Sequence, residues 1–303
     1  MFDWLYKTVG LAYREAWAVV QIFENLKEMF TGFSLKGFFS GILAVIELFG
    51  MLLFGTPTTP RGQELNLDGY QLVFCDEFEG DSLNTEAWQY RGNGARRSGF
   101  NAPSQVVIKD GKMTITGEYL KDGQYGEGWY AGMVSLKEKY TRGYFEIRCI
   151  CNKDAAFWSA FWIQANHPYE AEYSQGGVGG AEIDIFEAMS YDSAFPNSVT
   201  STVHCAGVDG VQEGFQSAIL GDFKGNNIYE EFNTYGLEWT EDEYIFYING
   251  VETTRTSFGN GVSQVPEEVI VSLEIPGDDK LENFDKETYK TEFIVDYVKI
   301  YQK

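Results

Sequence analysis

The sequence predicts an all-β sandwich that follows a helical N-terminal segment. From about Leu65 to the end of the chain, short runs of alternating apolar residues recur. Two dipeptides typical of tight hairpins, Asp110-Gly111 and Asn249-Gly250, join neighbouring runs. No stretch after residue 65 has the period of a long amphipathic helix. Residues 65–303 therefore have the pattern and the usual size of one two-sheet domain.

The expected strands follow the apolar alternation in order along the chain. We expect them at 70–74, 105–108, 113–116, 144–151, 157–163, 198–204, 234–239, 244–248, 251–255, 269–275 and 293–301. The Asp-Gly dipeptide joins 105–108 to 113–116, and the Asn-Gly dipeptide joins 244–248 to 251–255. Aromatic residues make up 16% of the chain, and Gly is frequent at 33 residues; both suit an all-β protein with aromatic clefts.

Residues 1–55 differ from everything after them. Apolar residues at helical spacing fill positions 2–30, and 37–55 is almost continuously apolar, interrupted by Glu47. A membrane span needs roughly 17–25 apolar residues, and an acid near the bilayer centre costs about 2–3 kcal/mol. We expect 37–55 to anchor the protein in a membrane. The alternative is a helical hairpin that packs on a partner or lies in the membrane interface.

The lysines before this run indicate which side the rest of the chain occupies. Lys27 and Lys36 precede the apolar run and favour an N-terminus that stays inside. Residues 56–64 are rich in Thr and Pro, which predicts an extended linker. We therefore expect residues 65–303 to form a domain on the extracellular face, as a monomer.

Charge and cysteines limit the classes of partner. The formal net charge is −22, which excludes nucleic acid because nothing offsets phosphate repulsion. A neutral polymer fits better. Of the four cysteines, Cys149 and Cys151 share one face of a predicted strand with apolar residues, and we expect buried thiols there. Cys205 follows His204, but no second Cys/His pair has zinc spacing.

The most informative stretch is 179–189, Gly-Gly-Ala-Glu-Ile-Asp-Ile-Phe-Glu-Ala-Met. It places three carboxylates within six residues, separated by apolar side chains. On a strand, Glu182 and Asp184 point to one face, whereas Glu187 points to the other. One β-bulge around Ile185-Phe186 would turn Glu187 back beside the other two. Crowded carboxylates on one face of a sheet are what glycosidic-bond cleavage needs. The alternative, a solvated strand edge, fits poorly with the apolar residues between the acids.

This motif and several strands outside it resemble glycoside hydrolase family 16, the family of laminarinases, lichenases and agarases. The resemblance spans 70–302 and is carried by the segments 72–78, 143–148, 157–162, 182–187, 235–240 and 295–301. The fold that it implies is a curved β-jelly roll with a cleft across its concave face. Alternation alone predicts the sandwich class without separating a jelly roll from other sandwiches.

The resemblance assigns a role to each acid. It implies that Glu182 is the nucleophile, Glu187 the acid/base and Asp184 the assisting carboxylate of a retaining mechanism. We expect the neighbouring acids to raise the pKa of Glu187, so that it is protonated for the first step. No cofactor is needed for this chemistry.

Further substrate-binding candidates lie outside the motif. The resemblance places Trp158 where an indole stacks on sugar, and alternation puts Trp162 on the same face. His204 matches a family histidine near the acid/base. Trp129, with Tyr130, could form another sugar platform. Arg96, with Arg97, could reach a sugar hydroxyl or an acidic group, or stay solvated in its loop.

A structural calcium is common in the family, on the convex side of the fold. Its positions correspond here to Glu79, Gly111 and Asp296. Calcium prefers oxygen ligands, partly from the backbone, so side-chain identity tests this expectation poorly.

The expected activity is a retaining endo-glycoside hydrolase that cleaves a β-linked polysaccharide. β-1,3-Glucan is the first choice of substrate, and a β-galactan of algal or host origin is the second. A sulfated polymer fits this acidic chain only if Arg96 and Arg97 face the cleft. The segment before the motif lacks the tryptophan of many laminarinases. A transglycosylase shares the mechanism, and a non-catalytic glucan-binding protein shares the fold, although such proteins lose the glutamates retained here.

Overall fold

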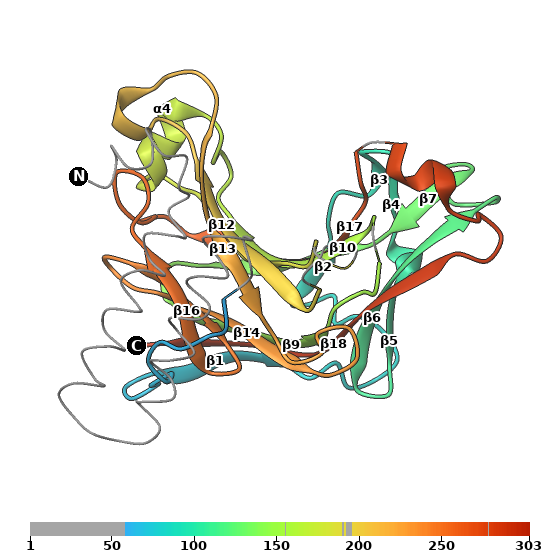
Figure 1. Ribbon diagram of the computed structural model, residues 1–303, viewed down its shortest axis with the longest axis horizontal. Helices are drawn as coiled ribbons and strands as arrows, with labels where there is room; N and C mark the ends of the chain where they lie inside the picture. Colours follow the sequence, from blue (N-terminus) through green and yellow to red (C-terminus); the bar gives the residue numbers. More distant parts are fainter. Residues whose placement is uncertain (1–57, 155, 190, 192–195, 278) are drawn as a thin grey trace.

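Two curved sheets pack face to face in the computed structural model, which describes residues 58–303 apart from 155, 190, 192–195 and 278 (Figure 1). The strands are β1 Gln71–Asp76, β2 Trp88–Tyr90, β3 Gly94–Arg96, β4 Gly99–Asn101, β5 Val106–Lys109, β6 Lys112–Leu120, β7 Gly128–Ala131, β8 Met133–Tyr140, β9 Gly143–Ile150, β10 Trp158–Gln164, β11 Glu182–Glu187, β12 Ser198–Cys205, β13 Gln216–Lys224, β14 Asn233–Trp239, β15 Tyr244–Ile248, β16 Val251–Thr256, β17 Glu267–Glu274 and β18 Lys290–Gln302. Within the described residues the helices are short: α4 Ala171–Ser174 and the 3-10 turns Pro103–Gln105, Gln175–Gly177, Val208–Gly210 and Asp279–Asn283.

The strand order separates an outer sheet from the sheet that carries the acidic motif. The motif sheet has seven strands in the order β13-β12-β11-β10-β17-β8-β2. The other sheet has eleven, in the order β16-β15-β14-β9-β18-β6-β7-β4-β3, with β1 paired to β18 and β5 to β6. All pairs are antiparallel except β4 with β7. This all-β sandwich is the expected class.

Both predicted hairpins are confirmed. Lys109 pairs with Lys112 across Asp110-Gly111, and Ile248 pairs with Val251 across Asn249-Gly250. The four turn residues have φ between 51° and 75°. Positive φ at both central positions is the requirement of the turns that match strand twist, which explains the Asp-Gly and Asn-Gly dipeptides.

The core lies between the sheets and follows the period of two. On β10, Phe161 and Ile163 are fully buried in the core, whereas Trp162 points to the opposite face. This is the predicted division of the strand. Cys149 and Cys151 are buried free thiols, as expected.

The expected linker is instead bound along the edges of both sheets. We call residues 58–64 the strap. Thr58 exchanges backbone hydrogen bonds with Asp222 and Lys224 of the β13 strand (2.9 and 2.8 Å). Gly62 and Gln63 exchange them with Glu252 of β16 (2.9 Å each). This extended segment satisfies some of the unpaired backbone groups of both edges, so residues 58–64 are bound to the domain.

The membrane anchor expected at 37–55 lies outside the described residues, as does the remainder of 1–57. Among the residues that are described, no helix has the length and apolar character of a membrane span.

The motif sheet bends so that its open face is concave. Figure 1 shows one arm formed around β12, β13 and α4, and a second arm around β3, β4 and β7. Strands β10 and β17 run along the floor between them (Figure 1).

Candidate active site

A β-bulge in β11 gathers the three acids of the motif on the concave face. Against β10, Asp184 pairs with Trp162 and Phe186 with Phe161, which leaves Ile185 as the extra residue. Against β12, Asp184 pairs with Thr202 and Glu187 pairs with Thr200. Between these two pairs β11 therefore advances by three residues while β12 advances by two. The predicted bulge is confirmed, and it cancels the odd spacing that would otherwise turn Glu187 away.

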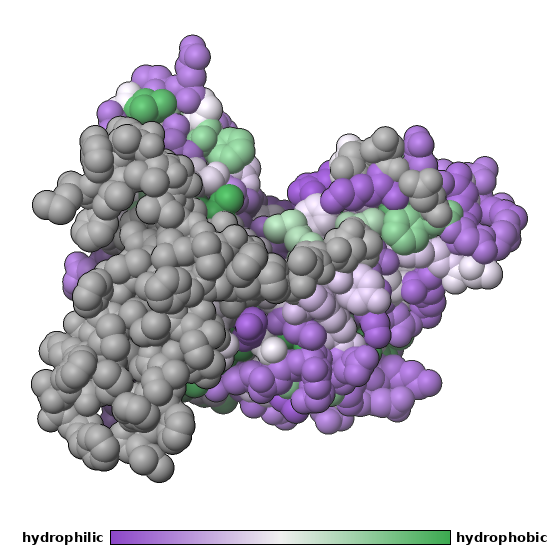
Figure 2. Space-filling view, viewed as in Figure 1, coloured by the Kyte–Doolittle hydropathy of each residue, from purple (hydrophilic) through white to green (hydrophobic). Residues whose placement is uncertain are grey.

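The three acids line one hollow of about 200 Å³ between the two arms. Figure 2 shows this side of the molecule indented between the arms. Its lining combines carboxylates, arginines and aromatic side chains: Arg91, Arg96, Arg97, Ala160, Trp162, Gln164, Tyr169, Glu182, Asp184, Glu187 and Glu274. A concave site with convergent charged groups is the usual form of a substrate pocket.

Glu187 has the environment of a proton donor. Burial, followed by the charge of Asp184, raises the pKa of Glu187 to about 8. The indole Nε1 of Trp158 donates to Glu187 Oε1 at 2.8 Å and opposes part of that increase. The predicted direction of the shift is confirmed, although burial is a larger cause than the crowding of acids.

Asp184 and His204 form a hydrogen-bonded pair beside Glu182. Burial, followed by the charges of Glu182 and Glu274, raises the pKa of Asp184 well above its usual range. Burial also lowers the pKa of His204. The contact of 3.2 Å between His204 Nε2 and Asp184 Oδ2 thus joins two groups that favour their neutral forms. The other ring nitrogen, Nδ1, is 2.6 Å from Ser217 Oγ, which fixes the imidazole orientation.

Glu182 has hydrogen-bond donors of its own. It lies directly opposite Gln164 on β10 and His204 on β12. Gln164 Nε2 donates to Glu182 Oε2. The hydroxyl of Tyr169 also lies close: burial, and then the charge of Glu182, raises the pKa of that phenol. These two side chains hold the Glu182 carboxylate in one orientation, with its oxygens directed into the hollow.

Two arginines of the opposite arm reach the same hollow. Arg96 Nη2 is 2.6 Å from Glu274 Oε2, and Arg97 Nη2 is 3.6 Å from the same oxygen. The guanidinium of Arg97 lies 4.7 Å from the ring centroid of Trp158, a cation–π distance. One face of the indole expected to stack on sugar therefore carries Arg97, while its N–H is bonded to Glu187.

Trp129 is not part of this cluster. Only 6% of its surface is exposed, and its ring packs edge-on against Tyr119, Phe157 and Tyr289. Tyr130 is also fully buried. Packing among core aromatics leaves little of the indole free for a sugar, so the platform expected at Trp129 is not formed.

The expected calcium positions do not form a set of convergent side-chain oxygens. Glu79 Oε1 lies beside the Cα of Gly111, 3.4 Å from where a Cβ would stand. The carboxylate of Asp296, however, accepts a hydrogen bond from Arg148, whose guanidinium takes the place of a cation there. Within the described part of the chain, the metal-ligating side chains that lie together are Glu182, Asp184 and His204. The calcium therefore gains no support from these side chains.

Sequence reasoning missed four polar residues of the hollow. Gln164 continues the alternation of Trp158 and Trp162 along β10, so its face was open to prediction. Glu274 lies opposite Trp158 on β17, a pairing made only by folding. The last two, Arg91 and Tyr169, follow β2 and β10 in loops, where no period indicates their direction.

Comparisons with known proteins agree with this geometry. The family model described as "Beta-porphyranase A-D, GH16 domain" matches residues 71–303. The glucan endo-1,3-beta-glucosidase A1 of Niallia circulans is 26% identical over 220 residues, 65% of this chain and 30% of that protein. The endo-1,3-1,4-beta-glycanase EglC of Rhizobium meliloti is 29% identical over 177 residues, 56% and 34% of the two chains. The chain thus spans about a third of the length of these relatives.

A solved structure shares the fold. It is that of SCLam, described as a non-specific endo-beta-1,3(4)-glucanase from family GH16. The TM-score is 0.63 at 22% identity, over 82% of this chain and 97% of SCLam. This likeness supports the jelly-roll arrangement of the two sheets.

Proposed function

Since this chain belongs to glycoside hydrolase family 16, we propose that it is an endo-acting hydrolase that cleaves a β-linked polysaccharide by double displacement. The observation that carries the proposal is the bulge in β11, which brings Glu182, Asp184 and Glu187 to one hollow. Two carboxyls in different environments are the parts that this reaction needs: Glu182 accepts a hydrogen bond from Gln164, and Glu187 has a raised pKa.

In the first step Glu182 attacks the anomeric carbon, and Glu187 gives its proton to the leaving oxygen. The glycosidic bond breaks and a glycosyl-enzyme ester forms on Glu182. In the second step Glu187, now a carboxylate, takes a proton from water, and the resulting hydroxide displaces Glu182. The pKa of Glu187, about 8, supports the acid role at neutral pH.

Asp184 supports the nucleophile in this scheme. Its bond to His204 holds the side chain in one orientation. We assign Asp184 and His204 to orienting and tuning the pair, and Trp158 to the acid/base through its N–H.

The walls of the hollow suit a polymer that continues in both directions. Tyr169 and Phe215 are 43% and 56% exposed, and their rings lie 5.3 Å apart between centroids on the arm that contains α4. Arg96 and Arg97 stand on the other arm. Exposed aromatic faces bind the apolar faces of sugars, and an open groove admits the interior of a chain, which supports endo action.

The substrate that we propose first is a β-1,3-glucan, supported by the names of the curated relatives. A β-galactan with anionic groups is the second candidate. A sulfated polymer is expected to fit this acidic chain only if Arg96 and Arg97 face the cleft. Both arginines line the hollow, which supports this candidate. The matching family model is also described as a β-porphyranase domain.

The test is release of reducing ends by the full chain from laminarin, mixed-linkage β-glucan, agarose, porphyran, carrageenan and mucin galactans. Activity on laminarin that is lost in Glu182→Ala would support the glucanase. Activity restricted to a galactan would keep the mechanism and select the second substrate. Retention of the anomeric configuration in the first product, followed by NMR, tests double displacement; inversion would contradict it.

We also propose that residues 37–55 attach the domain to the extracellular face of a membrane. The support is the apolar run and the lysines that precede it. Fractionation of cells that express the full chain or a 58–303 fragment tests this. The full chain should sediment with membranes and the fragment should not; equal distribution would contradict the proposal.

A further inference from the structure

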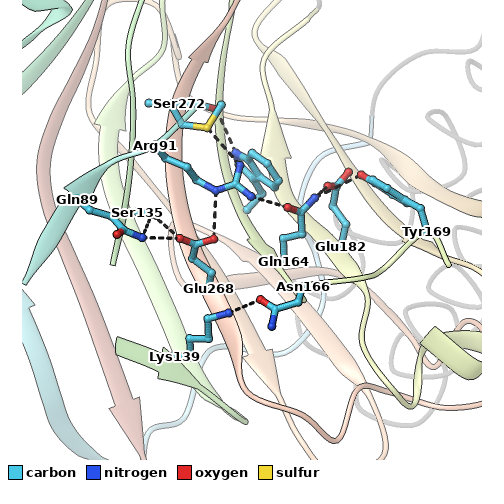
Figure 3. Close-up of polar contacts among 12 residues, drawn as sticks. Gln89, Arg91, Ser135, Lys139, Gln164, Asn166, Tyr169, Glu182, Glu268 and Ser272 are labelled. Atoms are coloured by element: carbon cyan, nitrogen blue, oxygen red, sulfur yellow. Dashed lines mark hydrogen bonds and ion pairs between the residues drawn. The ribbon is translucent and has the colours of Figure 1, made fainter. Parts of the chain in front are cut away.

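A chain of hydrogen bonds leads from Glu182 to a cation outside the acidic motif (Figure 3). Gln164 donates to Glu182 through Nε2 and accepts through Oε1 from Arg91 Nη2 at 2.6 Å. Arg91 Nε in turn is 3.1 Å from Glu268 Oε2. The catalytic carboxylate is thereby connected, through one amide, to an ion pair on the far side of that amide.

The register of the sheet makes this chain of contacts possible. Gln164 on β10 lies directly opposite Glu182 on β11 and directly opposite Glu268 on β17. Three polar side chains thus lie in a row across three strands on the concave face. Arg91 enters the row from the segment after β2, which places its guanidinium against both Gln164 and Glu268 (Figure 3).

The orientation of the Gln164 amide decides whether a hydrogen-bond donor or an acceptor faces Glu182. An amide has an acceptor end and a donor end, and rotation by 180° exchanges them. With the oxygen toward Glu182, two acceptors would repel; with the NH₂ group toward it, the carboxylate gains a donor. Guanidinium has donors only. The amide can therefore bond to Arg91 in one orientation alone, with Oε1 toward Arg91 and NH₂ toward Glu182.

Arg91 itself is held in place from several sides. Its backbone N–H donates to Met133 O at 2.9 Å, and its guanidinium lies 5.1 Å from the ring centroid of Trp162. Glu268, its ion-pair partner, also accepts from Ser135 Oγ at 2.6 Å and from Gln89 Nε2 at 3.0 Å. A cation fixed in this way can impose an orientation on the amide instead of following it.

We infer that Arg91 is a positioning residue for the reaction: it locks the Gln164 amide so that Gln164 donates to the attacking carboxylate of Glu182. The inference rests on the proposed function, because it assigns a role relative to the nucleophile. The donated bond holds the attacking oxygen in place. It also stabilises that carboxylate when it leaves in the second step.

Other ionisable groups face Glu182 and contribute to any pH profile. They come from its own strand, from β12, from β17 and from the loops at both walls: Asp184, Glu187, His204, Glu267, Glu274, Tyr169, Arg91, Arg96 and Arg97. The test therefore compares variants that leave all of these in place except the one residue changed.

The experiment measures kcat, KM and the melting temperature of the full chain and of its variants Arg91→Met, Arg91→Lys and Gln164→Glu. Arg255→Met is the matched control: Arg255 is 27% exposed against 26% for Arg91, and it also pairs with glutamates, but it lies on β16 of the other sheet. We expect Arg91→Met to lower kcat/KM about tenfold to a hundredfold, the effect of losing a charge-assisted hydrogen bond.

The separate values of kcat and KM distinguish positioning from a general loss of stability. In Arg91→Met kcat should fall while KM and the melting temperature stay nearly unchanged, because the attacking oxygen of Glu182 then lacks an oriented donor. Arg91→Lys keeps a donor for Gln164 Oε1 and should retain most of the rate. Gln164→Glu puts an acceptor beside Glu182 and should show the largest loss.

Each remaining outcome is decisive. An unchanged kcat in Arg91→Met, or an equal fall of kcat in Arg255→Met, would overturn the inference while leaving the proposed function intact. Absence of turnover in the unaltered chain on every polysaccharide would overturn the proposed function, and the role of Arg91 with it.

Discussion

Glu187 meets opposing influences at the scale of a single residue. Burial and the charge of Asp184 favour its protonated form, and the hydrogen bond from Trp158 opposes them. The balance sets the pH at which the proton is lost, and thus the upper pH limit of the first chemical step.

Replacement of Trp158 by Phe should shift that limit. Phe keeps an aromatic ring beside the substrate but removes the N–H that donates to Glu187 Oε1. The pKa of Glu187 should rise above about 8, and the basic limb of kcat/KM should move to higher pH. The measurement is the pH–rate profile on the best substrate.

Trp162→Phe is the control for this change. Its indole N–H donates to Ser272 Oγ at 3.0 Å and not to a catalytic acid. The Trp162→Phe variant should keep the basic limb of kcat/KM in place, even if its maximal rate falls. A limb that moves equally in both variants would contradict the role assigned to Trp158.

Glu182 and Glu187 should each be indispensable for turnover. Glu182→Ala removes the group that forms the ester, and Glu187→Ala removes the proton donor, which is typically worth about 10²–10⁴-fold in rate. Both variants should keep the far-UV circular dichroism of the unaltered chain. Full activity of Glu182→Ala would contradict the mechanism.

Glu267 gives a residue-scale prediction about stability. It is fully buried on β17, accepts from the Ala181 N–H at 2.9 Å, and burial raises its pKa to about 8. Between about pH 4.3, the ordinary value, and pH 8, the folded chain holds a proton that the unfolded chain has lost. Stability therefore falls as pH rises through this window, by up to about 1.4 kcal/mol per pH unit.

Glu267→Gln should flatten this dependence, because an amide keeps the acceptor for Ala181 and does not ionise. The measurement is the free energy of unfolding in urea at pH 5 and pH 8. Glu213→Gln, at an exposed position, should leave the slope unchanged. A slope that stays equally steep in Glu267→Gln would show that another group causes it.

At the scale of elements, the bulge in β11 decides whether the acids face one another. Deletion of Ile185 would restore regular pairing with β10 and β12 and turn one end of the motif to the core side. We expect turnover to be lost, with a cost in stability of a few kcal/mol for a misplaced buried carboxyl. Ile185→Val, which keeps the residue count, should retain activity.

The Ile185 deletion and Ile185→Val are compared by measuring turnover and thermal unfolding. A deletion variant that is folded and active would show that the bulge does not position Glu187.

The strands differ in how far the sequence predicts them. The apolar residues of β10, β14 and β18 give a clear pattern. The prediction that Glu182 and Asp184 share a face, and that Glu187 needs a bulge to join them, required only the two-residue period of a strand. The three-residue strands β2, β3 and β4 are too short for a period to appear. β8 ends in the charged run 137–139, and β13 includes exposed Ile219, so their patterns were weak.

Among site residues the same distinction holds. Glu182 and Glu187 are close in sequence, so a local motif revealed them. Arg91, Gln164 and Glu268 are joined only through the pairing of β10 with β17 and the position of the segment after β2. Such long-range register is a product of packing, and no local pattern encodes it. The contacts of the strap with β13 and β16 depend on the same long-range packing.

At the scale of the whole molecule, the strap joins the two sheets at one end. Its four backbone hydrogen bonds with β13 and β16 should together contribute about 1–3 kcal/mol after the cost of ordering the segment. A 65–303 fragment should therefore unfold at lower urea concentration than a 58–303 fragment. Equal midpoints would show that the strap adds no stability.

The strap also affects intermolecular pairing between the sheet edges of two copies of the protein. β13 and β16 are the terminal strands in the order of their sheets, and the opposite ends are the three-residue strands β2 and β3. Exposed strand edges are templates for aggregation, and natural proteins protect them by covering them or keeping them short. Here the strap binds one end of each long terminal strand, β13 at Asp222 and Lys224 and β16 at Glu252, and the opposite terminal strands are short, so less unpaired edge is left for intermolecular β-pairing.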